Sequence, residues 1–287
     1  MSHSTSSRIW STAGWTRASA WGKALGLWVP SGVIGVWVVL ALLAPWLPLA
    51  PADIALPKVL EGPSQEAWLG YDALGRPILD RLLIGARTSF LVAFWVVLVS
   101  SALGAAVGTL SGYLGGIVDQ VIVRVIDVFL AFPGILLAIA LAGVMGPGID
   151  NVVVALSAVG WVGYARLARA QTLSLKTREH VQAAVALGTT AARIMRRHLL
   201  PLMAAPLIIE ATFGVAGIVI AEAGLSFLGL GVQPPAASWG SMIRDGTRYM
   251  LVAPHLVLAP GVALALVVLT VNLLGDRLRD RLDVRTR

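Results

Sequence analysis

Long runs of uncharged, mostly apolar residues divide the chain into segments of membrane length. A helix that crosses a bilayer needs about 20 consecutive apolar residues. Five runs are this long, at 24–52, 88–118, 128–149, 223–243 and 249–275. Two further apolar stretches are weaker, because 151–165 is short and 199–221 is interrupted by Glu210.

The run at 223–243 contains Gln233, Pro234 and Pro235 with several glycines and serines, which are typical of loops. We interpret it as a loop and as a candidate re-entrant segment. The remaining pattern predicts an all-α, polytopic membrane protein with six transmembrane helices. The predicted spans are 26–47, 88–110, 120–143, 150–168, 202–224 and 254–275.

The basic residues lie unevenly between the two sides that six spans define. One side holds both termini, the 2–3 turn and the 4–5 loop, and it carries 16 of the 22 Lys and Arg residues. Loops rich in Lys and Arg stay in the cytoplasm, so we expect both termini to be cytoplasmic. The predicted parts are a cytoplasmic tail (1–23), a first transmembrane helix (24–52), a periplasmic loop (53–87), a five-helix core (88–275) with a cytoplasmic loop (169–201), and a cytoplasmic C-terminal tail (276–287).

Composition supports a membrane protein and excludes several kinds of chemistry. Hydrophobic residues make up 57% and charged residues 13% of the 287 positions, against about 25% charged in soluble proteins. The net charge of +7 comes from residues beside apolar runs, which favours topology signals over nucleic-acid binding. The absence of cysteine excludes thiol catalysis. The four scattered histidines predict no metal site, and we expect no cofactor.

The cytoplasmic loop has the most informative pattern. Residues 179–188 form a predicted short helix of mostly small residues, which Gly188 ends as a C-cap. A second predicted helix places Arg193, Arg196 and Arg197 on one face. Pro201 opens the fifth span, where its missing N–H costs nothing. For an arbitrary membrane protein, this would be a solvated basic loop at the lipid headgroups.

The spacing within this loop resembles the "EAA" loop of ABC-importer permeases. The residues that carry the resemblance are Ala183, Ala184, Gly188, Leu200 and Pro201, with Gln182 where that family usually has Glu. In that family the loop forms the coupling helix, which sits in a cleft of a separate ATPase subunit. The resemblance implies that Ala183 and Ala184 form a close-approach face and that the arginines contact the ATPase.

Further motifs are similar to the peptide/nickel branch of these permeases. They are Trp-Leu-Gly-Tyr-Asp-Ala-Leu-Gly-Arg at 68–76, Gly-Ala-Arg-Thr-Ser at 85–89, the Gly-rich segment 221–231 and Asn-Leu-Leu-Gly-Asp at 272–276. Pro77 departs from the family, which often has Asp there. The resemblance covers about residues 53–283.

The resemblance implies the function and the partners. It implies an inner-membrane permease for di- or oligopeptides that works with a second homologous permease, two cytoplasmic ATPase subunits and an extracytoplasmic solute-binding protein. Nickel or another small solute is the alternative cargo. The chain itself lacks a P-loop, since its one Gly-Lys pair, Gly22-Lys23, is followed by Ala24. We therefore predict a transport subunit and no enzyme.

Ionisable residues inside a membrane are functional candidates, because their burial is costly. Glu210 and Glu222 are candidate pathway or gate residues, with pairing to a neighbouring helix as the structural alternative, and His255 is a weaker candidate. Arg124 and Asp127, three residues apart, predict a local ion pair.

Two other classes of function remain open on the sequence alone. An ion-coupled secondary transporter would use Glu210 as a proton or ion site and would need no ATPase. An intramembrane hydrolase would use Ser226 and His255, but Ser226 lacks the G-x-S-x-G context of a nucleophile elbow.

Overall fold

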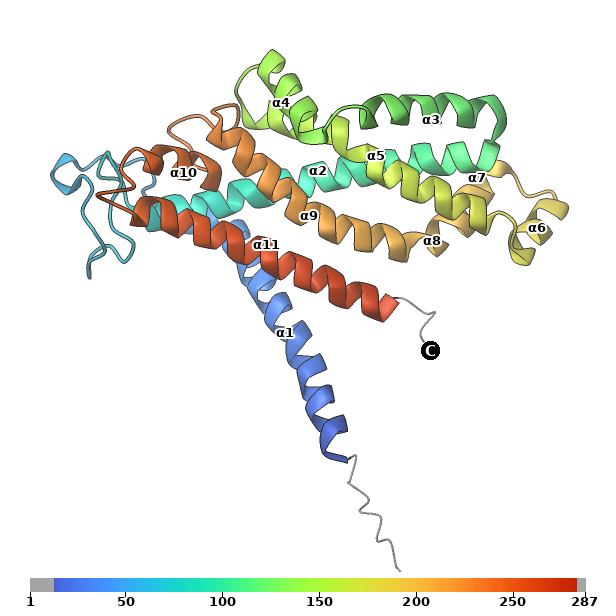
Figure 1. Cartoon of the computed structure of the whole chain (residues 1–287), viewed down its shortest axis with the longest axis horizontal. Helices are drawn as coiled ribbons and strands as arrows, with labels where there is room; N and C mark the ends of the chain where they lie inside the picture. Colours follow the sequence, from blue (N-terminus) through green and yellow to red (C-terminus); the bar gives the residue numbers. More distant parts are fainter. Residues whose placement is uncertain (1–12, 283–287) are drawn as a thin grey trace, which may run out of the picture.

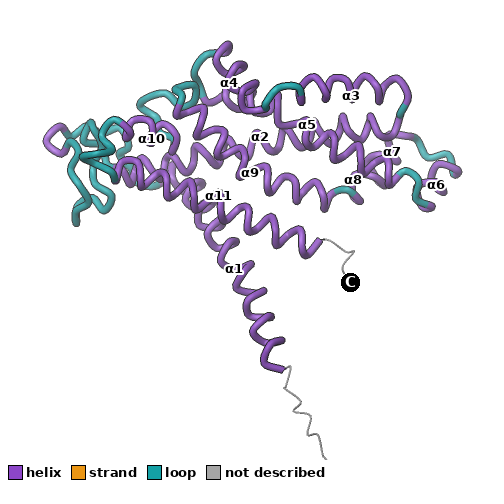
Figure 2. Tube along the Cα trace, viewed as in Figure 1, coloured by secondary structure: helices purple, strands orange, loops and turns teal. Residues whose placement is uncertain are grey.

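The computed structural model describes residues 13–282, with side chains from residue 28 onward, as a set of helices joined by loops (Figures 1 and 2). Among these residues the β pairing is limited to an isolated bridge between Tyr71 and Pro77, so the predicted all-α class is confirmed. The α-helices are α1 (Ala13–Leu43), α2 (Ile78–Leu114), α3 (Gly116–Leu130), α4 (Gly134–Met145), α5 (Ile149–Leu175), α6 (Glu179–Ala186), α7 (Ala191–Ile194), α8 (Leu200–Leu202), α9 (Ala204–Phe227), α10 (Trp239–Thr247) and α11 (His255–Leu282). Three short helices complete the fold: the 3₁₀ turns η1 (Ala44–Trp46) and η2 (Leu56–Lys58) and the π-helix η3 (Met195–Leu199).

Five helices of the described chain are long and apolar enough to cross a membrane: α1, α2, α5, α9 and α11. The pair α3 and α4 also passes this test but bends by 85° at its break, so the count reaches six if the bent pair is one span. The predicted third span, 120–143, runs straight through this break. Pro133 causes the bend, because it disfavours helical geometry at Phe132 and cannot donate a backbone hydrogen bond.

Several helices extend past the apolar runs that predicted them. Helix α2 begins at Ile78, ten residues before the predicted span, and α11 continues to Leu282 beyond residue 275. The run at 223–243, interpreted as a loop, contributes the last turn of α9 and the start of α10. Uncharged runs mark the part of a helix that meets lipid, whereas the helix itself can continue into water.

Helices α2 and α5 pack backbone against backbone. Gly104, Gly108 and Gly112 recur every four residues and so lie on one face of α2. A side chain at Gly108 would collide with the backbone carbonyl of Ala165 on α5. Small residues allow this close approach in membranes, where packing and not the hydrophobic effect holds helices together.

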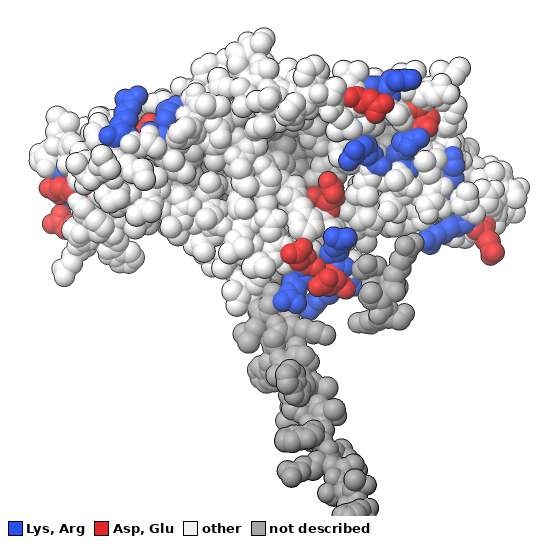
Figure 3. All heavy atoms as spheres, viewed as in Figure 1, with Lys and Arg blue, Asp and Glu red and all other residues white. Residues whose placement is uncertain are grey.

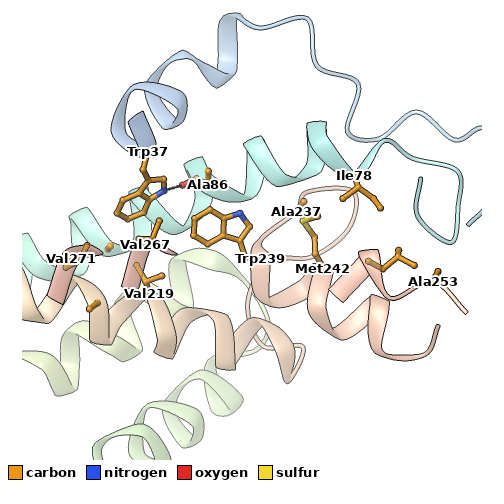
Figure 4. Close-up of a cluster of buried hydrophobic side chains, with 13 residues drawn as sticks. Trp37, Ile78, Ala86, Val219, Ala237, Trp239, Met242, Ala253, Val267 and Val271 are labelled. Atoms are coloured by element: carbon orange, nitrogen blue, oxygen red, sulfur yellow. Dashed lines mark hydrogen bonds between the residues drawn. The ribbon is translucent and has the colours of Figure 1, made fainter. Parts of the chain in front are cut away.

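A second contact joins α1, α2, α9, α10 and α11 around two tryptophans (Figure 4). The indole N–H of Trp37 donates to the carbonyl of Ala86 at 3.1 Å, and that of Trp239 donates to Leu82 at 3.0 Å. The ring of Trp37 meets Phe90 edge to face. Both indole donors are therefore satisfied within an apolar cluster.

The helices place α6 and α10 at opposite ends of the molecule (Figure 1). We call residues 49–77 together with α10 the α10 end, and residues 176–203 the α6 end. Helix α10 begins with a capping box, in which Ser238 and Ser241 bind each other's backbone N–H.

Candidate functional site

Helix α6 is held against the rest of the chain by one apolar face. Val181 is buried, and it packs in a cluster with Leu175, Ile194, Leu199 and Met203. Ala184, three residues after Val181, is 8% exposed and shares this inward face. The cluster fixes how the short helix stands at the α6 end.

Gly188 ends α6 as predicted. The N–H of Gly188 donates to Val185 at 2.9 Å, and the N–H of Thr189 donates to Ala184 at 3.1 Å. These two bonds form a Schellman motif, which requires a left-handed residue after the helix, and Gly188 has φ +76°. No atom lies within 4 Å of where a side chain at Gly188 would begin, so the space beside it is open.

The outward face of the loop is exposed and mixed in character. Gln182 and Ala183 are exposed, Leu187 is 86% exposed, and the Gln182 amide donates to the carbonyl of Lys176 at 2.7 Å. The predicted second helix is irregular, because η3 follows α7 after one turn. Arg193, Arg196 and Arg197 are nonetheless all exposed, whereas Leu200 is half-buried and Pro201 is exposed. Figure 3 shows Lys and Arg side chains gathered at this end.

The expectation that Ala183 and Ala184 share one docking face is wrong for Ala184. Ala183 is exposed, whereas Ala184 is buried and lies at helical spacing from Val181 on the inward face of α6. Neighbouring helical positions differ by about 100° around the axis, so two consecutive residues cannot both face a partner squarely. Of the two alanines, Ala183 is therefore the one that a partner can touch.

Glu222 lies on α9 and is buried against α2. Its side chain is 1% exposed, and it accepts hydrogen bonds from the hydroxyls of Ser89 at 3.0 Å and Ser226 at 2.7 Å. This matches the structural alternative, pairing with a neighbouring helix. The Nε2 atom of His255 is buried and has no hydrogen-bond partner among the described residues.

Glu210 is placed differently. It is exposed on α9, and no basic side chain among residues 28–282 pairs with it. It lies beside Gly163 of α5, where a side chain would begin 3.3 Å from the Glu210 Oε1 atom.

The α10 end contains a buried ion-pair network that the sequence did not indicate. Asp72, 4% exposed, accepts from Arg76 Nε at 2.8 Å and from Arg81 Nη1. Arg81 also faces Asp245 of α10 at 3.7 Å. The motif at 68–76 thus ties the segment before α2 to both α2 and α10.

Local geometry fixes the charge on Asp72. Burial alone would raise the pKa of its carboxyl, but the backbone N–H groups of Arg76 and Leu74, together with the Arg81 and Arg76 guanidinium groups, hold the pKa below its ordinary value. Asp72 is therefore a structural anion at neutral pH.

A second ion pair joins α3 to α5. Arg169 binds Asp119 with two hydrogen bonds of 2.6 and 2.7 Å, the bidentate geometry typical of arginine. The predicted pair between Arg124 and Asp127 does not form among the described side chains, which are both exposed. Among all the described residues, no three His, Asp or Glu side chains lie close enough together to hold a metal ion.

The fold is that of an importer permease. It matches a chain of the inward-facing MetNI methionine ABC transporter with a TM-score of 0.58 and 21% identity, covering 71% of this chain and 97% of that one. A second crystal form of MetNI gives a TM-score of 0.57.

Residues 104–287 match the family model of the binding-protein-dependent transport system inner membrane component, and the chain belongs to this family. It is 43% identical over 227 residues to the glutathione transport system permease protein GsiD of Pectobacterium atrosepticum. It is 42% identical over 228 residues to the dipeptide transport system permease protein DppC of Alkalihalophilus pseudofirmus. Each match covers 79% of this chain and 75% of the relative. The chain is thus a transport subunit.

Proposed function

We propose that this chain is a permease subunit of an ABC importer and forms part of the translocation pathway for di- or oligopeptides. The observation that carries the cargo class is its identity of more than 40% with permeases named for a dipeptide and for glutathione, which is itself a short peptide. The partners are a second homologous permease, two ATPase subunits and a solute-binding protein.

The α6 end is the surface that receives an ATPase subunit. Its exposed face offers Gln182, Ala183 and Leu187, beside three exposed arginines. An apolar side chain that is 86% exposed, on a loop outside the spans, is well suited to insertion into a partner. The chain has no nucleotide-binding motif of its own, so the ATPase partner supplies the energy.

The α6 end faces the cytoplasm, and the α10 end faces the solute-binding protein. This orientation is supported by the distribution of Lys and Arg, with 16 of 22 on the side of the α6 loop and the termini. In this orientation the chain lies in the inner membrane and has both termini in the cytoplasm.

The coupling role is tested by Gly188→Val and Ala183→Trp. A β-branched residue at Gly188 disfavours the left-handed cap by about 1–2 kcal/mol, and a large residue at Ala183 obstructs docking without disturbing the buried cluster. Both variants should insert normally but lose stimulated ATP hydrolysis and peptide uptake in proteoliposomes.

Gly188→Asn is the matched control, because asparagine tolerates the left-handed region, and it should retain activity. Ala184→Trp should instead unpack α6 and lower the amount of folded protein. Wild-type ATPase binding and uptake in both Gly188→Val and Ala183→Trp would show that this loop does not couple ATP hydrolysis to transport.

A further inference from the structure

Helix α9 has two faces with different surroundings. Glu222 is buried against Ser89 of α2, and the buried Ser226 donates to it. Glu210 lies on another face, which it shares at helical spacing with Gly214, Gly217 and Ala221. The three residues named with Glu210 are small and uncharged.

A groove follows this second face. It lies between α4, α5 and α9 and encloses about 170 Å³. Its lining is wholly apolar and combines small residues with larger aliphatic ones: Gly134, Ala138, Gly160, Gly217 and Ala221 with Ile135, Leu156, Val159 and Ile218. Glu210 lies beyond the groove toward the α6 end, against Gly163, which is three residues after Gly160 on α5. Glu210 does not line the groove, but it lies on the same face of α9 as Gly217 and Ala221, which do.

Two polar groups beside this face have unused hydrogen-bonding capacity. Glu210 is exposed and has no ion-pair partner among residues 28–282. The hydroxyl of Tyr164 is buried, has no partner among the described residues, and lies 2.6 Å from where a side chain at Gly214 would begin. Because an unpaired carboxylate is costly in contact with lipid, this face of α9 must meet water or protein.

We propose that Glu210 binds the α-ammonium group of the transported peptide, and that the groove between α5 and α9 is the wall along which the peptide main chain passes. This inference rests on the proposed function. Every peptide with a free N-terminus carries this cation near neutral pH, whatever its sequence. The apolar lining of the groove offers no side-chain hydrogen bond that would select one peptide sequence, so the carboxylate recognises what all these cargoes share.

The first test measures the charge selectivity of the groove. The chain has no cysteine, so Gly163→Cys and Gly217→Cys each introduce one reporter thiol. Each reporter is labelled in the complete transporter with a cationic trimethylammonium thiosulfonate reagent and an anionic sulfonate one, with Glu210 present and with Glu210→Gln. The ratio of the two rates removes the intrinsic reactivity of the thiol.

Both thiols should react in at least one nucleotide state. The cation-to-anion ratio at residue 163 should fall at least about fivefold with Glu210→Gln, because two unit charges about 4 Å apart in water change one rate by about this factor and the ratio combines attraction of the cation with repulsion of the anion. The change at residue 217, two helical turns away, should be smaller. Two unreactive thiols, or a ratio at residue 163 that Glu210→Gln leaves unchanged, would overturn the proposal.

The second test uses alanyl-alanine and its N-acetyl derivative as probes, added at equal concentration in the absence of the binding protein. The free-amine dipeptide should slow labelling at residue 163, the acetylated one should not, and Glu210→Gln should remove the protection. Equal protection by both probes, or by neither, would contradict ammonium binding. ATP-driven peptide uptake by the wild-type transporter is measured separately, and its absence would refute the proposed function instead.

Discussion

The α10 end and the α6 end use glycine in opposite surroundings. At the α10 end, Gly70 and Gly75 have φ +77° and +73°, and a side chain on either would strike a backbone carbonyl of the segment that precedes it. At the α6 end, Gly188 has a similar φ of +76°, but nothing lies within 4 Å. The backbone conformation is the same, whereas the neighbours differ.

This difference shows at which end the chain packs its own glycine turns. The α10 end fills its own interior with backbone and with the ion pairs of Asp72, Arg76 and Arg81. The α6 end buries one face of α6 and leaves Leu187 and Gly188 with empty space around them. The turn at Gly188 therefore leaves room for a partner, whereas the space beside Gly70 and Gly75 is already filled by the chain itself.

The largest effect is expected from Asp72→Asn. Removal of one partner from a buried ion pair costs about 3–5 kcal/mol, because Arg81 is left buried with only the distant Asp245 opposite. The purified variant should melt at a lower temperature, and segment 49–77 should become sensitive to protease. Asp53→Asn is the control, since Asp53 is exposed; equal melting of the two variants would mean that the network does not hold this end together.

A smaller effect is expected from Gly75→Ala, compared with the same change at Gly188. Both alanines adopt a left-handed conformation at a cost of about 1–2 kcal/mol, but only Gly75→Ala adds a collision with Ala55. Thermal melting should rank Gly75→Ala as clearly less stable than Gly188→Ala. Gly62→Ala, with open space and no positive φ, should melt like the wild type. If Gly188→Ala melted at a lower temperature than Gly75→Ala, the two glycines would not differ in packing as described.

The smallest effect is expected from acid. The pKa of Asp72 is lower in the folded protein than its unfolded value of about 3.9, so its contribution is complete above about pH 4 and is lost as pH falls through the folded pKa. Hydrogen exchange at the Leu74 and Arg76 amides, which bind this carboxylate, should accelerate in that range at the α10 end. Asp72→Asn should show no such step; a step of the same size in the variant would assign it to another group.

Much of the fold follows from the apolar runs, because a bilayer imposes a helix of known length wherever such a run crosses it. The sequence also contains the signal for the bend between α3 and α4, since Pro133 lies in the middle of the predicted third span. The start of α2 could not be found this way, because Arg81 looks like a charge outside the membrane until Asp72 is brought beside it by the fold.

At the α6 end, the sequence predicts where α6 ends but not which of its residues are buried. Gly188 marks the end of α6 by its chemistry alone. Ala184 is buried on the face of α6 that carries Val181, and Val181 packs in a cluster with Ile194 and Met203, which are distant along the chain. Glu210 and Glu222 look alike as intramembrane acids, and only their neighbours separate a hydrogen-bonded group from an exposed one.

Helix α2 runs without a proline or a break for 37 residues, a length of about 55 Å at 1.5 Å per residue. Arg81 anchors it in the α10 end, while near its other end the carbonyl of Gly112 accepts from Lys176, one residue after α5. Between these points its glycines lock it to α5. Helix α2, packed against α5, is therefore a rigid rod. A tilt imposed on it at the α6 end also moves its other end, about 50 Å away at the α10 end, because no hinge lies between them.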